Sequence, residues 1–532
     1  MDVTIREQAT KIGVLMFSLP FFLGLFPLVV MVVLIINVKM PVYKAVLITL
    51  ALVLGITYFF FDASPTMLTN AVAYGAIKGL WPIAIVIFGA IYAYNLMQQT
   101  GAISIIRDQL SRVTDDRRLL LLLIAWGFGG FLEAAAGFST AVAIPLGILM
   151  ALGFNPIRAA IAALVADTTA TVFGAVGIPL TVMGDMLHTP LVGMNGASVM
   201  VVAQLAILNI LIPFFLVVIM EGSVKALKGI FFVTLMTGVF TLVPQFIIAL
   251  FVGPELTAFG GAIVSMAVML VLFRRMNGKT PAAYKIEASH DEATASRSEV
   301  LRAVSIYVMM FLFILVCSPL FPSVVAYLNQ FSSSLSFPVT ETKTLKATFA
   351  WITTPGMLIL FASLIGGVLF QRATPSMIVK TLFTTLNQLK FSALAIAVIV
   401  AMATVMDLTG LIAVVAQPLF DATGRFYPFF APLIGGVGTF VTGSVTNANV
   451  LFGNLQTIAA NHLSMDPTWL VAANAAGATA TKMLAPQSIT IAVSSAGLTN
   501  ADSTLMKGTA PWALLYVLIV CAVVGLTSLF FM

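Results

Sequence analysis

Residues 119 to 153 read LLLLLIAWGFGGFLEAAAGFSTAVAIPLGILMALG and carry a single charge, Glu133, with small residues at the centre of the stretch. One membrane-spanning helix takes about 20 apolar residues, so this stretch is too long for one helix and rather short for two. Glycine and alanine at its centre favour a break at which the chain turns back. We therefore interpret residues 119 to 153 as a re-entrant helical hairpin, which enters and leaves the membrane on the same side.

Residues 428 to 463 show the same organisation. Their centre is TGSVTNAN, from Thr442 to Asn449, a run of small and polar side chains between two apolar stretches. GGFLEAAAGFS at Gly129 to Ser139 and GTFVTGSVTNA at Gly438 to Ala448 occupy corresponding places in the two stretches. We expect a second re-entrant hairpin over residues 428 to 463.

The composition of the whole chain is typical of a membrane protein. Of its 532 residues, 60% are hydrophobic and only 9% are charged, which excludes a soluble globular protein. Long runs of Leu, Ile, Val and Phe satisfy their backbone hydrogen bonds in a lipid bilayer only as helices. The apolar runs outside the hairpins predict about twelve transmembrane helices. The sequence therefore predicts an all-α polytopic membrane protein with two additional re-entrant hairpins.

The distribution of basic residues predicts the orientation. With both termini outside, 19 of the 26 Lys and Arg residues lie in cytoplasmic loops and five lie outside, as the positive-inside rule requires. The first hairpin then enters from the cytoplasm and the second from outside. We therefore predict two inverted repeats, residues 1 to 228 and 303 to 532, joined by two helices and a polar cytoplasmic loop over residues 229 to 302. Such repeats are typical of alternating-access transporters, with the binding site near the midplane.

Three charged residues of the membrane segments are the main functional candidates. An ionisable side chain at the centre of a bilayer costs about 2.5 to 3.5 kcal/mol. Glu133, at the tip of the first hairpin, and Asp167, in the following span, are candidates for a protonatable coupling group, and Glu133 also suits a cation ligand. Lys482, in the corresponding span of the second repeat, suits an anionic substrate. The alternatives are a hairpin tip that reaches water for Glu133 and a structural ion pair between Lys482 and Asp167.

The hairpin tips supply hydroxyl and amide groups. Thr446 and Asn447 are candidates to cap the returning helix of the second hairpin, as Ser139 and Thr140 are in the first, and two such helix starts can bind an anion. Ordinary close packing of small residues is the alternative. Asn474 lies on the same helix face as the membrane lysine, two turns earlier. We expect a substrate site lined by Lys482, Ser139, Thr140, Ser444, Thr446, Asn447 and Asn474.

Other classes of chemistry find no support in the sequence. Cys317 and Cys521 lie far apart in apolar runs and the three histidines show no metal-ligand spacing, so we expect no disulfide, metal or other cofactor. A Gly-rich phosphate loop and the HExxH and GxSxG motifs are absent from the sequence, which argues against a pump or a membrane enzyme. Basic residues are scattered over short loops without interleaved aromatic residues, so we expect no nucleic-acid partner.

Several longer blocks of sequence allow a comparison with known families. The blocks are YGAIKGLWPIAIVIFGAIYAY (Tyr74 to Tyr94), GFGGFLEAAAGFSTAVAI (Gly127 to Ile144), FGAVGIP (Phe173 to Pro179), GPEL (Gly253 to Leu256), TGSVTNANVLFGNLQ (Thr442 to Gln456) and KMLAPQSITIA (Lys482 to Ala492). With these blocks in this order, nearly the whole chain resembles the L-lactate permease family, which includes glycolate permeases. The resemblance implies a secondary transporter of the inner (plasma) membrane that moves L-lactate, glycolate or a similar small 2-hydroxy monocarboxylate together with protons.

The chain departs from the family pattern at the proposed site. The second tip of the family reads GSDT, where this chain has Val445 in place of the acid. The first tip reads EGAAGFG, where this chain has Ala134 and Ser139, and the family stretch NTAPVAFG is DTTATVFG here, from Asp167 to Gly174. We therefore hypothesise that Asp167 takes the place of the acid that is missing from the second tip.

The sequence leaves the coupling ion and the oligomeric state open. A sodium-coupled carrier of another organic anion is the main alternative, because hairpin carbonyls together with Ser, Thr and Asn oxygens can also coordinate sodium. An anion channel is a weaker alternative that also uses opposed hairpins. A homodimer through the first two spans of each repeat is compatible with the sequence.

Overall fold

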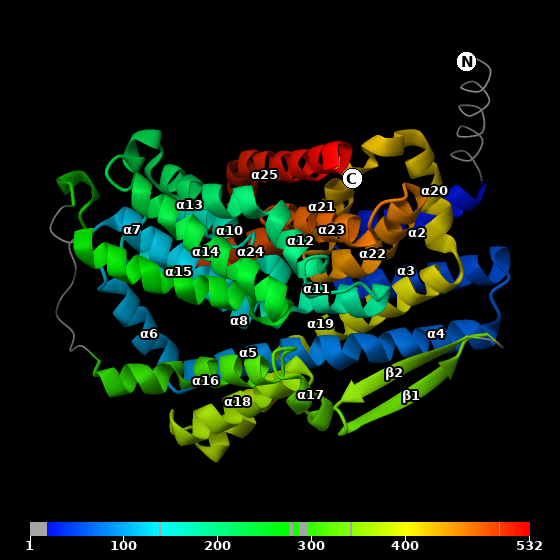
Figure 1. Ribbon diagram of the computed structural model, residues 1–532, viewed down its shortest axis with the longest axis horizontal. Helices are drawn as coiled ribbons and strands as arrows, with labels where there is room; N and C mark the ends of the chain where they lie inside the picture. The colour runs from blue at the N-terminus through cyan, green and yellow to red at the C-terminus, as the bar shows by residue number, and fades with distance from the viewer. Residues whose placement is uncertain are drawn as a thin grey trace, which may run out of the picture.

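The computed structural model describes residues 19–137, 140–276, 280–286, 295–340, 343–499 and 501–531. Helices make up most of this part of the chain (Figure 1). Within the described residues, eight helical segments are long and apolar enough to span a membrane, or ten when two bent pairs each count as one span. The chain is therefore a polytopic membrane protein of the all-α class, as predicted. The number of about twelve spans stays a prediction, because several of the helices in question are shorter than 18 residues.

The first half of the chain contains a group of long helices, a hairpin and a broken helix. The group consists of α2 (Leu19–Ile36), α3 (Val42–Phe60), α4 (Pro65–Lys78), the π-helical turn η1 (Gly79–Ala84), α5 (Ile85–Gln99) and α6 (Ala102–Ser111). The hairpin comprises α7 (Arg117–Leu121), η2 (Leu122–Phe128), α8 (Gly129–Ala135) and α9 (Thr140–Ala151). The broken helix and its successors are α10 (Pro156–Ala166), η3 (Thr171–Phe173), α11 (Gly174–Leu187), α12 (Ala197–Gln204), α13 (Ala206–Glu221) and η4 (Val224–Leu227).

Two further helices lead to a second half with the same order of parts. The connecting segments are α14 (Phe231–Phe251), α15 (Pro254–Met276) and η5 (Ala282–Tyr284). The next group consists of α16 (Arg297–Val316), α17 (Pro322–Leu328), β1 (Ser332–Pro338), β2 (Thr344–Ala350), α18 (Pro355–Leu369), α19 (Pro375–Leu408), α20 (Leu411–Thr423) and η6 (Gly424–Phe429). The second hairpin is α21 (Ala431–Thr442) with α22 (Val445–His462), followed by α23 (Pro467–Lys482), α24 (Pro486–Ser495) and α25 (Asp502–Phe531).

Elements of the two halves pack on one another in matching ways. α3 packs on α19, the long helix of the second half, while α18 packs on α5, which continues the long helix of the first. In the same manner α20 packs on α2, and α6 packs on α16. The returning arm of each hairpin also contacts the broken helix of the other half, since α9 packs on α24 and α22 packs on α11. The two halves therefore build one interlocked core.

Both predicted hairpins appear as two helices that pack on each other. In the first, α8 and η2 pack against α9 across a break after Ala135. In the second, Gly443 ends α21 with a left-handed φ of 71°, and Ser444 begins α22 by accepting a hydrogen bond from the Asn447 amide at 3.3 Å. Glycine after a helix and serine before one are the residues that such ends favour. The re-entrant course of the two hairpins and the side from which each enters the membrane stay predictions.

A β-hairpin, which the sequence did not predict, lies among the helices of the second half. β1 and β2 pair in antiparallel fashion from Ser332 opposite Ala350 to Pro338 opposite Thr344. The alternation of larger and smaller side chains in SSSLSF and TLKATF is a strand pattern with a period of two. The hairpin lies along α4, where Asn70 donates a hydrogen bond to the Pro338 carbonyl at 2.6 Å.

Part of the polar loop that was predicted after α15 contacts the start of the first hairpin. Thr280 donates to Asp115 Oδ1 at 2.6 Å, and the Arg118 guanidinium lies 3.9 Å from the ring centre of Tyr284. Arg118 is itself buried and paired with Asp116 at 2.7 Å. Residues 280–286, which belong to the connection between the two halves, therefore contact residues 115 to 118 at the start of the first hairpin.

Close contact between α21 and α23 depends on two glycines. A Cβ atom on Gly477 would overlap the carbonyl of Pro432, and one on Gly435 would overlap the carbonyl of Asn474. Small residues at such positions let the helix backbones approach closely.

We expect Gly477→Ala to lower the free energy of unfolding by about 1 to 3 kcal/mol, because the added methyl group forces the two helices apart. Thermal unfolding of the purified protein in detergent measures this loss. Gly55→Ala on α3 is the matched control, since nothing lies within 4 Å of a Cβ atom at that position. Equal unfolding temperatures for the two variants would contradict the proposed contact.

Candidate functional site

Lys482, at the end of α23, binds two buried carboxylates from the first half of the chain. Its Nζ atom lies 2.9 Å from Oε1 of Glu133 on α8 and 2.9 Å from Oδ2 of Asp167 at the end of α10. It also donates a hydrogen bond to Oγ1 of Thr171 at 3.1 Å. The three charged residues expose only 2% (Glu133), 4% (Asp167) and 9% (Lys482) of their surfaces. We call Lys482, Glu133, Asp167 and Thr171 the Lys482 cluster.

An unwound segment of the first broken helix positions two members of this cluster. α10 ends directly before Asp167, and the helix axis bends by 58° between α10 and the segment that begins at Thr171. Ala175, Val176 and Gly177 then have positive φ angles of 44°, 59° and 75°. Such backbone angles cost roughly 1 to 3 kcal/mol at residues other than glycine and are concentrated at functional sites. The strained segment lies directly beside the buried charges.

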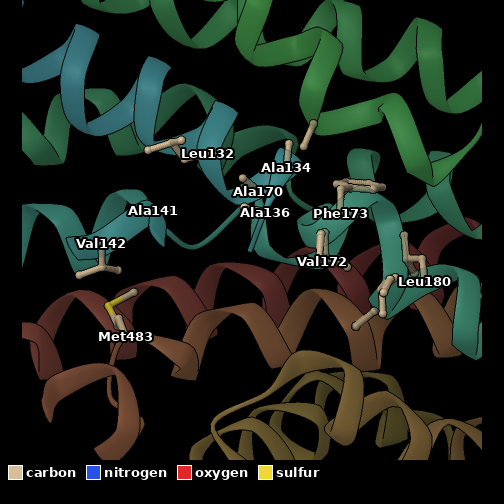
Figure 2. Packing of buried hydrophobic residues seen from close by; sticks show 14 of the residues in the cluster. Leu132, Ala134, Ala136, Ala141, Val142, Ala170, Val172, Phe173, Leu180 and Met483 are labelled. Carbon is tan, nitrogen blue, oxygen red and sulfur yellow. The ribbon is translucent and has the colours of Figure 1, made fainter. Parts of the chain in front are cut away.

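Small side chains let the tip of the first hairpin approach the unwound segment. Figure 2 shows Ala134 and Ala136 of the hairpin near Ala170 of the break, and all three side chains are buried. A Cβ atom on Gly137 would lie 3.1 Å from the Cβ atom of Ala175. Larger residues at the tip would therefore separate Glu133 from its partners on the other segments.

The charges of the Lys482 cluster do not balance when both carboxyl groups are ionised. Oε2 of Glu133 and Oδ1 of Asp167 are buried and have no hydrogen-bond partner among the described residues. Burial of an uncompensated negative charge is costly. The cluster therefore suits the uptake of one proton, shared by two carboxyl groups that face the same lysine.

The ammonium group of Lys482 has three N–H donors, and three oxygen atoms of the described residues surround it. These are Oε1 of Glu133, Oδ2 of Asp167 and Oγ1 of Thr171. An anion that binds Lys482 directly must therefore replace one of these oxygens. Protonation of a carboxylate weakens its hold on the lysine and lets the anion take its place.

Thr446 and Asn447 of the second tip are buried, but neither provides the helix cap that was predicted for it. The hydroxyl of Ser444 caps α22, whereas Thr446 and Asn447 were expected to do so. Ser444 Oγ thus accepts the amide N–H of Asn447, and the side chains of Thr446 and Asn447 are 8% and 7% exposed. In the first hairpin, Thr140 donates its hydroxyl hydrogen to the carbonyl of Gly137 at 2.7 Å. Ser139 lies outside the described residues.

Asn474 belongs to a separate chain of buried amides. Its Nδ2 atom donates to Asn449 Oδ1 at 3.1 Å, and its Oδ1 atom accepts from Gln456 at 3.4 Å. Asn449 in turn donates to the Pro179 carbonyl on α11 at 2.9 Å, and Tyr427 donates to Gln456 at 2.9 Å. This chain of hydrogen bonds joins α11, α22 and α23, so Asn474 is held by the protein rather than aimed at the Lys482 cluster.

Sequence analysis did not single out Asn449, Gln456 or Tyr427. The spacing of seven residues between Asn449 and Gln456 puts both on one face of α22, and this spacing is the signal that could have found them. Two charged residues outside the cluster, Lys78 and Arg158, have structural partners. Lys78 lies 3.7 Å from Asp185 on α11, and Arg158 donates to the Met220 carbonyl at 2.9 Å.

Comparison with known proteins gives the family. The sequence pattern of the L-lactate permease family matches residues 20–531. The chain belongs to this family. An L-lactate permease of Streptococcus iniae is 40% identical over 399 residues, which cover 75% of this chain and 82% of the other. An L-lactate permease of Bacillus subtilis strain 168 is 34% identical over 91% of this chain and 92% of the other.

A glycolate permease of Escherichia coli K12 is 32% identical to this member of the L-lactate permease family, over 96% of this chain and 95% of the other. The solved YdaH transporter of Alcanivorax borkumensis aligns over 90% of this chain and 89% of its own, with a TM-score of 0.46 and 13% identity. The relatives are named permeases. This chain is therefore a multi-pass membrane transporter and not an enzyme.

Proposed function

We propose that the protein is a secondary active transporter that carries small 2-hydroxy monocarboxylates, such as L-lactate or glycolate, together with protons by alternating access. The names of its relatives support the substrate class. The observation that carries the proposal is the Lys482 ammonium group held between Glu133 and Asp167 in a buried cluster. The ammonium group can release the carboxylate of Glu133 or Asp167 and bind the substrate carboxylate in its place.

Charge balance explains why substrate and proton move together. With one shared proton, the empty cluster carries one ammonium group and one carboxylate and is neutral. A substrate carboxylate that takes the place of one acid brings a negative charge, and a second proton on the displaced acid restores neutrality. A neutral site crosses the low-dielectric region at a much smaller cost than a charged one. One substrate anion therefore moves with one proton.

The hairpin tips complete the proposed substrate site. Lys482 holds the substrate carboxylate together with the start of α22 and the side chains of Ser444, Thr446 and Asn447. Ser139 and Thr140 contribute from the first tip. Because Asn474 uses its amide oxygen and nitrogen within the protein, a hairpin carbonyl is the better partner for the 2-hydroxyl group.

The moving unit consists of the two hairpins and the broken helices that contact them. The long helices α4, α5 and α19 with their neighbours form the fixed part. In this scheme residues 1–228 and 303–532 are inverted repeats, residues 229–302 connect them, and both termini lie outside the inner (plasma) membrane. Lys78 on α4 and Asp185 on α11 form a contact between the fixed part and the moving unit in the conformation described here.

Sodium is the alternative coupling ion, and one observation favours it. The unpartnered oxygens of Glu133 and Asp167 are hard ligands of the kind that alkali cations bind. A sodium ion at this place would balance the excess negative charge in the same way as a proton.

Uptake into proteoliposomes distinguishes these coupling ions. Labelled L-lactate and glycolate are added to vesicles that hold the purified protein, with an inward proton gradient or an inward sodium gradient imposed separately. We expect saturable accumulation with the proton gradient alone and none with the Lys482→Ala variant. Accumulation driven by sodium would replace the proton by sodium in the mechanism, and uptake of neither acid would point to a different organic anion.

The substitution Gly174→Ala tests the Lys482 cluster without removing any of its polar groups. A Cβ atom on Gly174 would lie 2.5 Å from Oε1 of Glu133, the oxygen that binds Lys482. We expect Gly174→Ala to push the carboxylate away from the lysine and to lower the uptake rate about tenfold, as the loss of roughly 1.4 kcal/mol implies. Gly147→Ala is the control, because a Cβ atom there meets nothing within 4 Å. Uptake by Gly174→Ala at the wild-type rate would contradict the importance of this contact.

A further inference from the structure

A large apolar cavity lies away from the Lys482 cluster, between the long helices of the two halves. Its volume is about 710 Å³, and residues of α4, η1 and α5 form one wall while residues of α19 form the other. Phe349 of β2 contributes an aromatic side chain to the lining. Pockets of roughly 300 to 1,000 Å³ enclose most of a small organic ligand.

The long helices of the two halves touch at several places, and two of these contacts adjoin the lining residues in sequence. At the first contact, a Cβ atom on Gly79 would lie 2.6 Å from Cα of Ala397, so the backbones meet there. At the second, Asn95 donates to Thr385 at 2.9 Å. Between the two contacts, Trp81 interrupts the helix with non-helical backbone angles, and side chains of both helices line the space.

The lining has one charged residue and one unsatisfied donor. Almost all of the lining side chains are aliphatic or aromatic, and Lys390 is the one charged residue among those that the structure describes there. Trp81 also lines the cavity, and its buried indole N–H has no hydrogen-bond partner among the described residues. Leu80 and Leu386, two further lining residues, are 49% and 48% exposed. The cavity is therefore accessible from the surface of a protein whose surroundings are lipid.

These features fit one kind of occupant. An acyl chain fills an apolar cavity, an ester carbonyl accepts a hydrogen bond from an indole N–H, and a phosphate group pairs with a lysine ammonium. We propose that the cavity lined by Trp81 and Lys390 is a binding site for one anionic phospholipid, with an acyl chain between α5 and α19 and the headgroup at Lys390. Such a lipid would brace the fixed part of the transporter. The proposal does not depend on which substrate or ion is transported.

Lipid retention tests this proposal. The full-length protein is reconstituted with palmitoyl-oleoyl phosphatidylglycerol or with phosphatidylcholine of the same chains, washed in detergent, and analysed for bound lipid by native mass spectrometry. We expect wild-type protein to retain about one phosphatidylglycerol per chain. Ala393→Trp, which fills the cavity with an indole ring, should lose it, and Lys390→Gln should reduce the preference for phosphatidylglycerol about fivefold. Lys380→Gln, on an exposed part of the same helix, should behave as the wild type.

Two results would overturn the proposal. One is that the wild-type protein retains both lipids equally and Lys390→Gln does the same. This result would show that Lys390 does not contact the headgroup. The other is a wild-type protein that light scattering shows to be a dimer and an Ala393→Trp variant that is a monomer with lipid still bound, because the cavity would then receive a second copy of the chain. Lys390→Gln keeps the test valid if Ala393→Trp does not fold.

Discussion

Replacement of Lys482 by methionine is expected to abolish concentrative uptake, with a loss of at least about 100-fold, and to destabilise the protein as well. The substitution keeps most of the side-chain volume but removes the ammonium group that lies 2.9 Å from both Glu133 and Asp167. Two buried carboxyl groups then remain without a cation, and breaking a buried ion pair in this way costs about 3 to 5 kcal/mol. Proteoliposome uptake and thermal unfolding measure the two effects.

A triple variant separates the role in transport from the role in stability. In Glu133→Gln/Asp167→Asn/Lys482→Met, the cluster has neither cation nor acid, so the cost of unpaired charge disappears. We expect most of the stability to return while uptake stays at the background level. Lys380→Met, on the exposed part of α19, is the control for removal of a lysine. Uptake by the triple variant at a rate near that of the wild type would show that the cluster is structural.

The second large effect is expected for Asp167→Asn, which should uncouple substrate movement from the proton gradient. In this hypothesis Asp167 is the displaced acid that binds the second, coupling proton, while Glu133 keeps the first. The amide imitates a permanently protonated Asp167, so the variant can no longer bind and release the coupling proton. Wild-type uptake should rise as the external pH falls. In the variant, uptake should be independent of external pH, and accumulation should fall about tenfold or more, since a tenfold gradient corresponds to about 1.4 kcal/mol.

Exchange of substrate across the membrane provides the control for this variant. Counterflow of labelled against unlabelled L-lactate needs no net proton movement, so we expect Asp167→Asn to retain it. Glu133→Gln is the matched comparison, because Glu133 binds the same ammonium group from the other side. If Asp167→Asn transports with unchanged pH dependence while Glu133→Gln does not, Glu133 carries the coupling proton and the hypothesis for Asp167 is wrong.

The charged part of the site could be predicted from the sequence because charge is rare in this chain. Only 9% of the residues are charged, so Glu133, Asp167 and Lys482 stand out within apolar runs, and the cost of burial requires that they meet partners. The alternative of an ion pair between Lys482 and Asp167 is also present in the structure. That pairing does not decide between a structural and a functional role, which is why the triple variant is needed.

Other parts of the site could not be predicted, for identifiable reasons. Ala175 and Val176 adopt left-handed backbone angles. Alanine and valine disfavour this conformation, so no sequence pattern indicates that the helix unwinds at these two residues. The hydrogen bond between Asn474 and Asn449 joins two helices. Helix periodicity predicts the face on which each residue lies, but not which residue of another helix it contacts. The strands β1 and β2 were missed because many of their residues are small or polar and exposed.

The most direct test of the central claim is the movement of protons during substrate entry. Proteoliposomes that contain the pyranine dye and the wild-type protein receive L-lactate from outside at equal pH on both sides, and protein-free vesicles measure the passive entry of lactic acid. We expect the lumen to acidify in step with lactate uptake, and the acidification to fall to the passive rate in Lys482→Met. Lactate uptake by the wild-type protein without acidification beyond the passive rate would contradict proton coupling at the Lys482 cluster.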